Sequence, residues 1–170
     1  YCIPLSSKYV ISGSLKKKSL GILQQAIKTD NHINILIANS VIKKKCKKVG
    51  ILGLSYKSNL KVSTLSPIIP FIKKLKSNKI SVKIFDPYFS NKEIKKIANA
   101  NTFKFPKDLS SFDCIIYSVN HYNFVKNKNK ILRNLKCKYF IDNTGEFKNS
   151  LNTLKAKKIN YILSGEKNWI

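Results

Sequence analysis

The residues best suited to chemistry stand where apolar, strand-like runs stop. The first run, Val49 to Leu54, leads into Gly53-Leu54-Ser55-Tyr56-Lys57-Ser58-Asn59. An aromatic ring and a flexible ammonium at the mouth of a strand suit a base and a phosphate, because Lys meets a phosphate as a point charge. The same run contains Gly50-x-x-Gly53, but the third glycine of a dinucleotide motif is missing. The sequence therefore predicts a tight strand end followed by a ligand loop.

Strands and helices that alternate along the chain must position this loop. Strand-like runs cover 49–54, 80–85, 114–119, 139–142 and 161–163, and helical patterns start at Ser66-Pro67 and cover 91–100, 123–134 and 149–156. This alternation is typical of βαβ units and predicts an α/β fold with a Rossmann-like parallel sheet covered on both faces. Ligands of such sheets bind at the carboxyl ends of the strands. Here those ends are 53–59, 86–90, 119–124 and 142–146.

The segment before the sheet divides into two parts. Residues 1–19 suggest a loop followed by a short polar segment, and residues 20–46 carry apolar side chains at helical spacing. A helix of about 25 residues would span about 37 Å, more than a compact domain covers. We therefore expect it to link domains or to pair with another subunit, ahead of a domain over 47–170.

Composition narrows the function classes. The 170 residues carry 33 Lys+Arg against 8 Asp+Glu, a net charge of +25, yet 43% are hydrophobic, as in folded domains. Arg133 is the single Arg, and the lysines are spread along the whole chain. Arg usually dominates specific nucleic-acid contacts, so solvated faces are favoured over a basic binding module, although non-specific attraction of polyanions is expected.

Features that the sequence lacks indicate where the protein works. No apolar run reaches the length of a membrane span, and no signal-peptide pattern opens the chain. The four cysteines form no CxxC pair, which predicts no metal site and a reducing, cytoplasmic location. The absence of Met indicates a processed piece or a fragment of a longer protein.

Several segments, in order along nearly the whole chain, resemble the UDP-glucose/GDP-mannose dehydrogenase family. In its UDP-binding domain, Gly53 to Pro67 is similar to G-L-A-F-K-x-N-x-D-D-x-R-x-S-P, Val82 to Tyr88 to V-x-x-Y-D-P-Y, Val119 to Phe124 to V-D-H-x-x-F, and Asp142 to Gly145 to D-T-R-G. Upstream, Tyr1 to Tyr9 resembles H-C-I-P-V-D-P-x-Y of the branch acting on UDP-N-acetyl-hexosamines, and Thr29-Asp30-Asn31 resembles the start of the family's long central helix.

The resemblance implies an NAD-dependent 6-dehydrogenase that oxidises a UDP-N-acetyl-hexosamine to its uronic acid for surface polysaccharide. Cys2 matches the nucleophile that captures the aldehyde intermediate, and Tyr56, Lys57 and Asn59 match the residues around UDP. NAD would be bound mainly by an N-terminal domain missing here, of which 1–19 is the nucleophile-bearing end. The helix over 20–46 would form a homodimer core.

Departures from the family pattern keep two alternatives open. Ser6 stands where the family has an Asp, and Thr64 and Thr144 stand where it has Arg. An uncharged Ser activates water poorly near neutral pH. A degenerate, non-catalytic remnant that keeps the fold and at most binds nucleotide weakly is therefore the first alternative, and a basic nucleic-acid-binding module is the second.

Overall fold

The chain folds around one parallel sheet. In the computed structural model, which describes residues 2–14 and 20–166, six strands lie in the order β3-β2-β1-β4-β5-β6. All neighbouring strands run parallel. The strands are β1 (Lys48–Leu52), β2 (Ser81–Phe85), β3 (Asn101–Thr102), β4 (Cys114–Tyr117), β5 (Tyr139–Asp142) and β6 (Asn160–Leu163). The expected Rossmann-like α/β sheet is confirmed.

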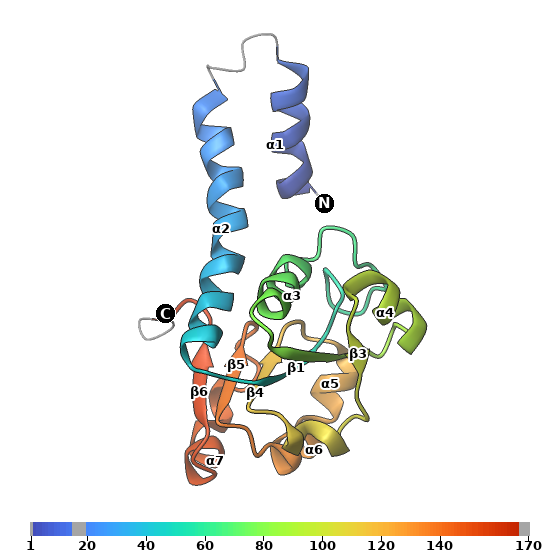
Figure 1. Ribbon diagram of the computed structural model, residues 1–170, viewed down its shortest axis with the longest axis vertical. Helices are drawn as coiled ribbons and strands as arrows, with labels where there is room; N and C mark the ends of the chain where they lie inside the picture. The colour runs from blue at the N-terminus through green and yellow to red at the C-terminus, as the bar shows by residue number, and fades with distance from the viewer. Residues whose placement is uncertain (1, 15–19, 167–170) are drawn as a thin grey trace.

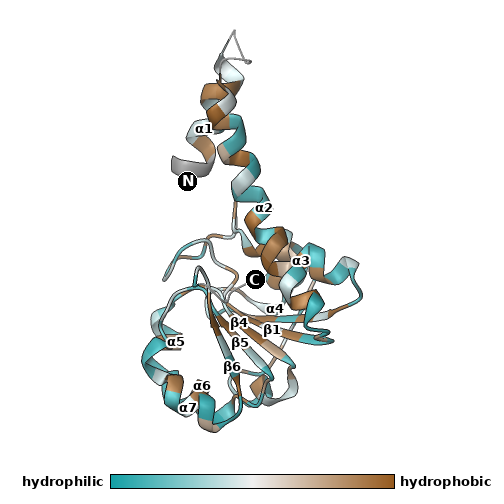
Figure 2. Cartoon of the chain, turned by 90° about the vertical axis from the view of Figure 1, so that its left-hand side faces the viewer, coloured by the Kyte–Doolittle hydropathy of each residue, from teal (hydrophilic) through white to brown (hydrophobic). Residues whose placement is uncertain are grey.

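Helices cover both faces of the sheet (Figures 1 and 2). One face packs against α3 (Ile68–Ser77), α4 (Asn91–Ala98) and the end of α2 (Gly21–Lys43), and the other packs against α5 (Tyr122–Lys126), α6 (Lys128–Asn134) and α7 (Leu151–Ala156). Strand β4 serves both layers, because its side chains alternate: Cys114 belongs to the first core and Ile115 to the second. This double burial explains the continuous apolar runs in the sequence.

The long helix α2 confirms the helix expected over 20–46. Its last turns are buried on the sheet domain at Ala38 and Val41, whereas Ile22 near its start is 87% exposed. Helix α1 (Cys2–Gly13) packs beside it, and the two rise above the sheet domain (Figure 1). The loop expected over 1–19 is therefore wrong for 2–13. Pro4 stands in the first helical turn, where the missing N–H costs nothing.

Other differences from the expected elements are local. The helix expected over 123–134 is broken at Asn127, whose side-chain amide bonds the carbonyl of Asn123; such local bonds compete with helix continuation. The helix expected to start at Ser66-Pro67 begins at Ile68, with Pro67 in the cap position and no side-chain hydrogen bond at the cap. Strand β3 and the 3-10 helix η2 (Lys107–Ser111) are too short to leave a periodic signal.

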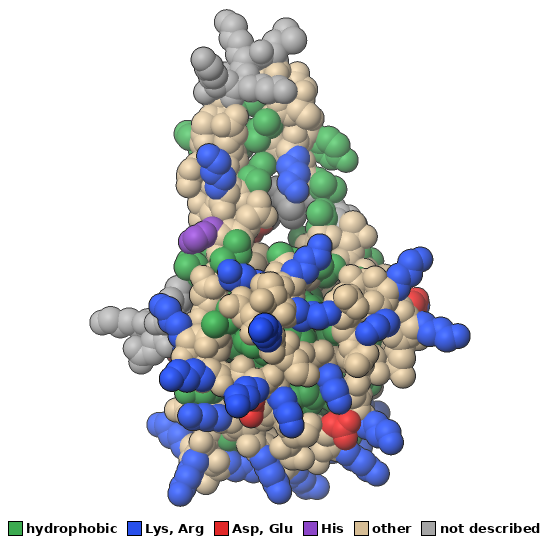
Figure 3. Space-filling model, in the orientation of Figure 1, with side chains coloured by type: hydrophobic (Ala, Val, Ile, Leu, Met, Phe, Trp, Pro, Cys, Tyr) green, Lys and Arg blue, Asp and Glu red, His purple; other side chains and the backbone are tan. Residues whose placement is uncertain are grey.

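On the face shown in Figure 3, basic side chains are spread over the sheet domain and do not gather into one stripe. Acidic side chains are few on the same face. This distribution agrees with the solvated faces expected from dispersed lysines. Among the described residues, no helix combines the length and apolar character that crossing a membrane requires.

Candidate functional site

The site is built on the loop that follows β1, residues 53–67. The loop begins at Gly53, whose φ of +102° favours glycine, and a Cβ there would lie 2.3 Å from Cγ1 of Val119. The Gly53 amide bonds the carbonyl of Phe85 at 2.9 Å. The chain therefore leaves the sheet in close contact with the ends of both neighbouring strands, β2 and β4.

A buried carboxylate at the end of β2 holds the first part of this loop. Asp86 is 2% exposed, and its Oδ2 accepts hydrogen bonds from the amides of Leu54 (2.7 Å) and Ser55 (3.0 Å) and from the Ser55 hydroxyl (3.1 Å). Its Oδ1 accepts the Tyr88 amide at 2.9 Å, so the carboxylate also fixes the turn that follows β2. One side chain thus fixes two loops.

His121 extends the same network to the third strand end. Its Nδ1 accepts the backbone N–H of Asn59 at 3.0 Å, so that nitrogen carries no proton, and Nε2 donates to Asp86 at 3.2 Å. The ring is fully buried. Burial acts to raise the pKa of Asp86, but the hydrogen bonds from His121 and from the amides of Tyr88 and Leu54 outweigh it, so the pKa lies below its ordinary value.

An exposed ion pair holds the far side of the loop. Lys61 Nζ lies 2.6 Å from Oε1 of Glu93, and 5.8 Å from the centre of the Phe89 ring. The hydrogen bond from Lys61, together with those from Ser90, lowers the pKa of Glu93 to about 2. Lys61, which replaces a family acid, therefore has a structural partner.

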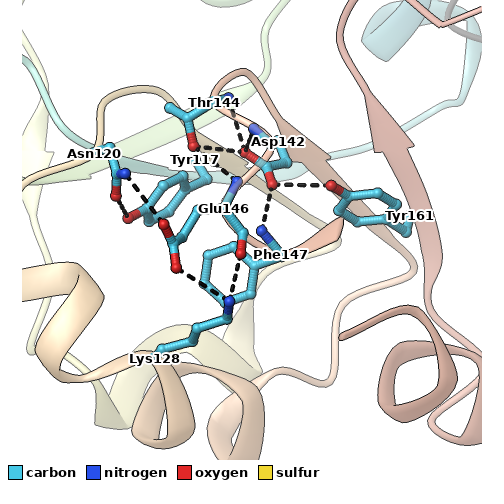
Figure 4. Close-up of polar contacts among 9 residues, drawn as sticks. Tyr117, Asn120, Lys128, Asp142, Thr144, Glu146, Phe147 and Tyr161 are labelled. Atoms are coloured by element: carbon cyan, nitrogen blue, oxygen red, sulfur yellow. Dashed lines mark hydrogen bonds and ion pairs between the residues drawn. The ribbon is translucent and has the colours of Figure 1, made fainter. Parts of the chain in front are cut away.

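At the end of β5, too, a buried carboxylate accepts hydrogen bonds from the loop that follows the strand (Figure 4). Buried Asp142 accepts the amides of Thr144 and Gly145 at 2.9 Å each, the Thr144 hydroxyl at 3.0 Å and the Tyr161 hydroxyl at 2.9 Å. Burial and the nearby Asp142 charge raise the pKa of Tyr161. Thr144, at a family Arg position, thus stabilises a turn.

Glu146 forms a second group of hydrogen bonds next to the turn that follows β5. It accepts hydrogen bonds from Asn120 (3.2 Å) and Lys128 (3.1 Å), and Asn120 in turn accepts the Tyr117 hydroxyl at 2.8 Å (Figure 4). These polar groups bond one another. We therefore assign the cluster to the framework of the loops rather than to a ligand.

A cavity of about 510 Å³ lies between the loop after β1 and the two N-terminal helices, within the size range of small-molecule sites. Its walls come from α1, α2, the loop and the start of α3. The lining residues are Ser7, Lys8, Ala26, Ile27, Asp30, Asn31, Asn34, Tyr56, Leu65, Ser66, Pro67 and Pro70.

The predicted binding residues are separated by this geometry. Tyr56 is half-buried and lines the cavity, whereas the neighbouring Lys57 is exposed and lies outside the lining set. Asn59 is turned to the framework: its Oδ1 accepts the Tyr122 amide at 2.7 Å, at the first turn of α5. Cys2 is the first residue of α1, and its side chain lies outside the described parts.

Sequence reasoning missed the cavity wall contributed by α2. Ile27, Asp30, Asn31 and Asn34 share one helical face at spacings of three and four. This spacing is visible in the sequence, but there the helix was expected only to link domains or to pair with another subunit. His121 is a structural residue: it directly precedes α5, and its ring joins the Asn59 amide to Asp86.

The described residues offer neither a metal site nor a dinucleotide cradle. No group of three or more candidate ligands among them is placed to hold a metal ion. The loop over 53–67 replaces the helix N-terminus that would cradle a dinucleotide phosphate directly after β1. NAD therefore does not fit these residues in the Rossmann manner.

The Asp86 network generates a stability prediction. Asp86→Asn should lower the free energy of unfolding by about 3 kcal/mol, because an amide leaves buried donors unpaired. Since the folded-state pKa is depressed, this contribution is present above the ordinary value of 3.8 and is lost as the pH falls below it. Urea unfolding at pH 7 and pH 3 measures both effects.

Asp108→Asn is the matched control, because that carboxylate accepts one backbone bond, from Lys104. If the difference in the free energy of unfolding between wild type and Asp86→Asn stayed constant from pH 7 to pH 3, the stabilising role of the Asp86 carboxylate would be contradicted.

Comparison with known proteins matches this chain to one family. The model of the UDP-glucose/GDP-mannose dehydrogenase family, UDP binding domain, matches residues 50–149, more than half of the chain. None of the curated proteins matches.

Solved structures share the fold at low identity. One is a UDP-D-ManNAc dehydrogenase from Pyrococcus horikoshii, which is 18% identical with a TM-score of 0.59; the match covers 83% of this chain and 33% of that one. Another is a GDP-mannose dehydrogenase from Pseudomonas aeruginosa, which is 20% identical with a TM-score of 0.59; the match covers 84% of this chain and 35% of that one. A UDP-N-acetyl-mannosamine dehydrogenase from S. aureus is 16% identical with a TM-score of 0.60; the match covers 74% of this chain and 30% of that one.

The chain spans about a third of the length of these solved structures. On the family match and the shared fold, it belongs to the UDP-glucose/GDP-mannose dehydrogenase family and contains that family's UDP-binding domain.

Proposed function

We propose that these residues form the nucleotide-sugar-binding part of an NAD-dependent 6-dehydrogenase, which oxidises a UDP-N-acetyl-hexosamine to its uronic acid for surface polysaccharide. The observation that carries the proposal is the loop over 53–67, fixed by Asp86 and His121, which places Tyr56 at a cavity beside exposed Lys57. Family membership supports the reaction class. The three cysteines whose side chains the structure describes, Cys46, Cys114 and Cys137, are free thiols, which fits the proposed cytoplasmic setting.

The proposal divides the reaction between two parts of the protein. An NAD-binding part outside these residues would take up the electrons, because the loop after β1 offers no dinucleotide cradle. The C6 alcohol of the substrate would first give up a hydride to NAD and become an aldehyde. Cys2 is the proposed nucleophile, which as a thiolate adds to that aldehyde and, once the oxygen takes up a proton, forms a thiohemiacetal. This adduct would give a hydride to a second NAD and become a thioester, which water cleaves to release the acid and the Cys2 thiolate.

Binding of UDP tests the nucleotide site. Lys57→Ala should weaken UDP binding about 3- to 10-fold, because one charge-assisted contact with phosphate is lost. Lys96→Ala, which removes an equally exposed Lys on α4, should leave the affinity unchanged. Calorimetric titration at moderate salt limits unspecific attraction. An equal effect of both variants would instead support a general polyanion binder.

The Cys2 proposal needs the protein with its NAD-binding part. Given NAD and UDP-N-acetylmannosamine or UDP-N-acetylglucosamine, that protein should produce NADH and uronic acid, and Cys2→Ala should reduce acid formation at least 100-fold, as expected for a covalent nucleophile. Full turnover by Cys2→Ala would refute the role of Cys2. No turnover by the wild type would favour the non-catalytic remnant.

A second copy of the chain is the proposed partner of α2. Ile22 and Ile33 are 87% and 42% exposed and stand three turns apart, so that they share one face with Ala26 and Thr29. Sedimentation velocity should give the mass of a dimer, and Ile22→Asp with Ile33→Asp should give a monomer of unchanged helicity. A monomeric wild type at tens of micromolar would rule out this pairing.

A further inference from the structure

Among residues 2–14 and 20–166, Ser66 is the one buried polar side chain without a hydrogen bond. The residue is 2% exposed, and within the described parts of the chain its hydroxyl is the only buried side-chain N or O atom without a hydrogen-bond partner. Its backbone is engaged: the amide bonds the carbonyl of Ser63 at 3.0 Å, and its carbonyl accepts the Ile69 amide at 3.1 Å. Buried hydroxyls are nearly always bonded, so this one requires an explanation.

The position of Ser66 suggests that explanation. It lies in the wall of the 510 Å³ cavity, close along the chain to Leu65 and Pro67, which also line it. Pro67 occupies the cap position of α3, so the hydroxyl is not recruited to the helix. A serine hydroxyl reaches three staggered positions by rotation about χ1. The hydroxyl oxygen itself is shielded from solvent in the present rotamer. A ligand in the cavity therefore supplies the missing partner once the side chain has rotated toward it.

The other walls indicate which part of a ligand fits. The cavity has one cation, Lys8, and one carboxylate, Asp30, so their formal charges cancel. Asn31 and Asn34 add neutral amides that donate and accept hydrogen bonds, and Pro70 adds an apolar surface. A diphosphate needs net positive charge, whereas an uncharged ring with hydroxyls and an acetamide suits carboxylate, amide and apolar walls.

We propose that Ser66 hydrogen-bonds the sugar ring of the nucleotide sugar, with the ring inside the cavity and the diphosphate outside it at exposed Lys57. This inference rests on the proposed function and adds an orientation and a specificity-determining residue to it. Ser66 then discriminates between a nucleotide and a nucleotide sugar. Its unmet hydroxyl lowers the stability of the free protein, and the bound sugar compensates for that loss.

The test compares UDP with UDP-N-acetylmannosamine on the 170-residue chain. Ser66→Ala should weaken binding of the nucleotide sugar about 3- to 10-fold and leave UDP binding unchanged, because only the ring loses a hydrogen bond. The midpoint of thermal unfolding of the free variant should rise by about 2–4 °C, because an unpaired buried hydroxyl is removed. Ser63→Ala, a loop serine outside the cavity walls, is the matched control and should change neither affinity.

The outcomes separate this inference from the function on which it rests. If the wild type binds UDP and UDP-N-acetylmannosamine with equal affinity, the placement of the sugar ring in the cavity is overturned, whereas the nucleotide site at Lys57 is not. An unchanged affinity of Ser66→Ala for UDP-N-acetylmannosamine, or an equal loss for UDP, also overturns the role of Ser66. Wild type that binds neither compound overturns the proposed function itself.

Discussion

The site depends on one buried carboxylate that serves three strand ends at once. Asp86 ends β2, binds the amides that follow β1 and accepts Nε2 of His121, which follows β4. A carboxylate in a buried position is stable only when its oxygens are fully bonded, and here its partners are the loop itself. The loop therefore cannot leave this position without depriving a buried charge of its hydrogen-bond donors, and this cost holds the loop and Tyr56 in place.

The strands and most helices were predictable because their signals are local. Apolar runs flanked by turn residues predict β1, β4 and β5, and they need no knowledge of distant contacts. The role of Asn59 was not predictable, because its side chain caps α5 from 63 residues away in the sequence. The helix α1 escaped prediction since Pro4 suggests a loop unless the helix begins just before it. The cavity depends on how α1 and α2 sit above the loop, a tertiary arrangement that periodicity does not encode.

The excess of lysine acquires a clearer meaning in the folded chain. Lys61 pairs with Glu93 where a family acid is expected, and Lys128 pairs with Glu146 beside the β5 turn. These lysines stabilise loops at the ligand edge of the sheet, while many others lie on exposed faces (Figure 3). Lys61 and Thr144, two departures from the family motif, thus each have a partner within the framework. Departures from the family motif need not dismantle the fold of the site.

The central claim is that Asp86 holds the loop after β1 in place. Native-state hydrogen exchange of the Leu54, Ser55 and Asn59 amides tests it most directly. The account predicts that these loop amides exchange as slowly as amides of β1 in the wild type, and that Asp86→Asn speeds their exchange far more than that of β5. Exchange of the three amides at the rate of an open surface loop, or equal acceleration throughout the sheet, would contradict it.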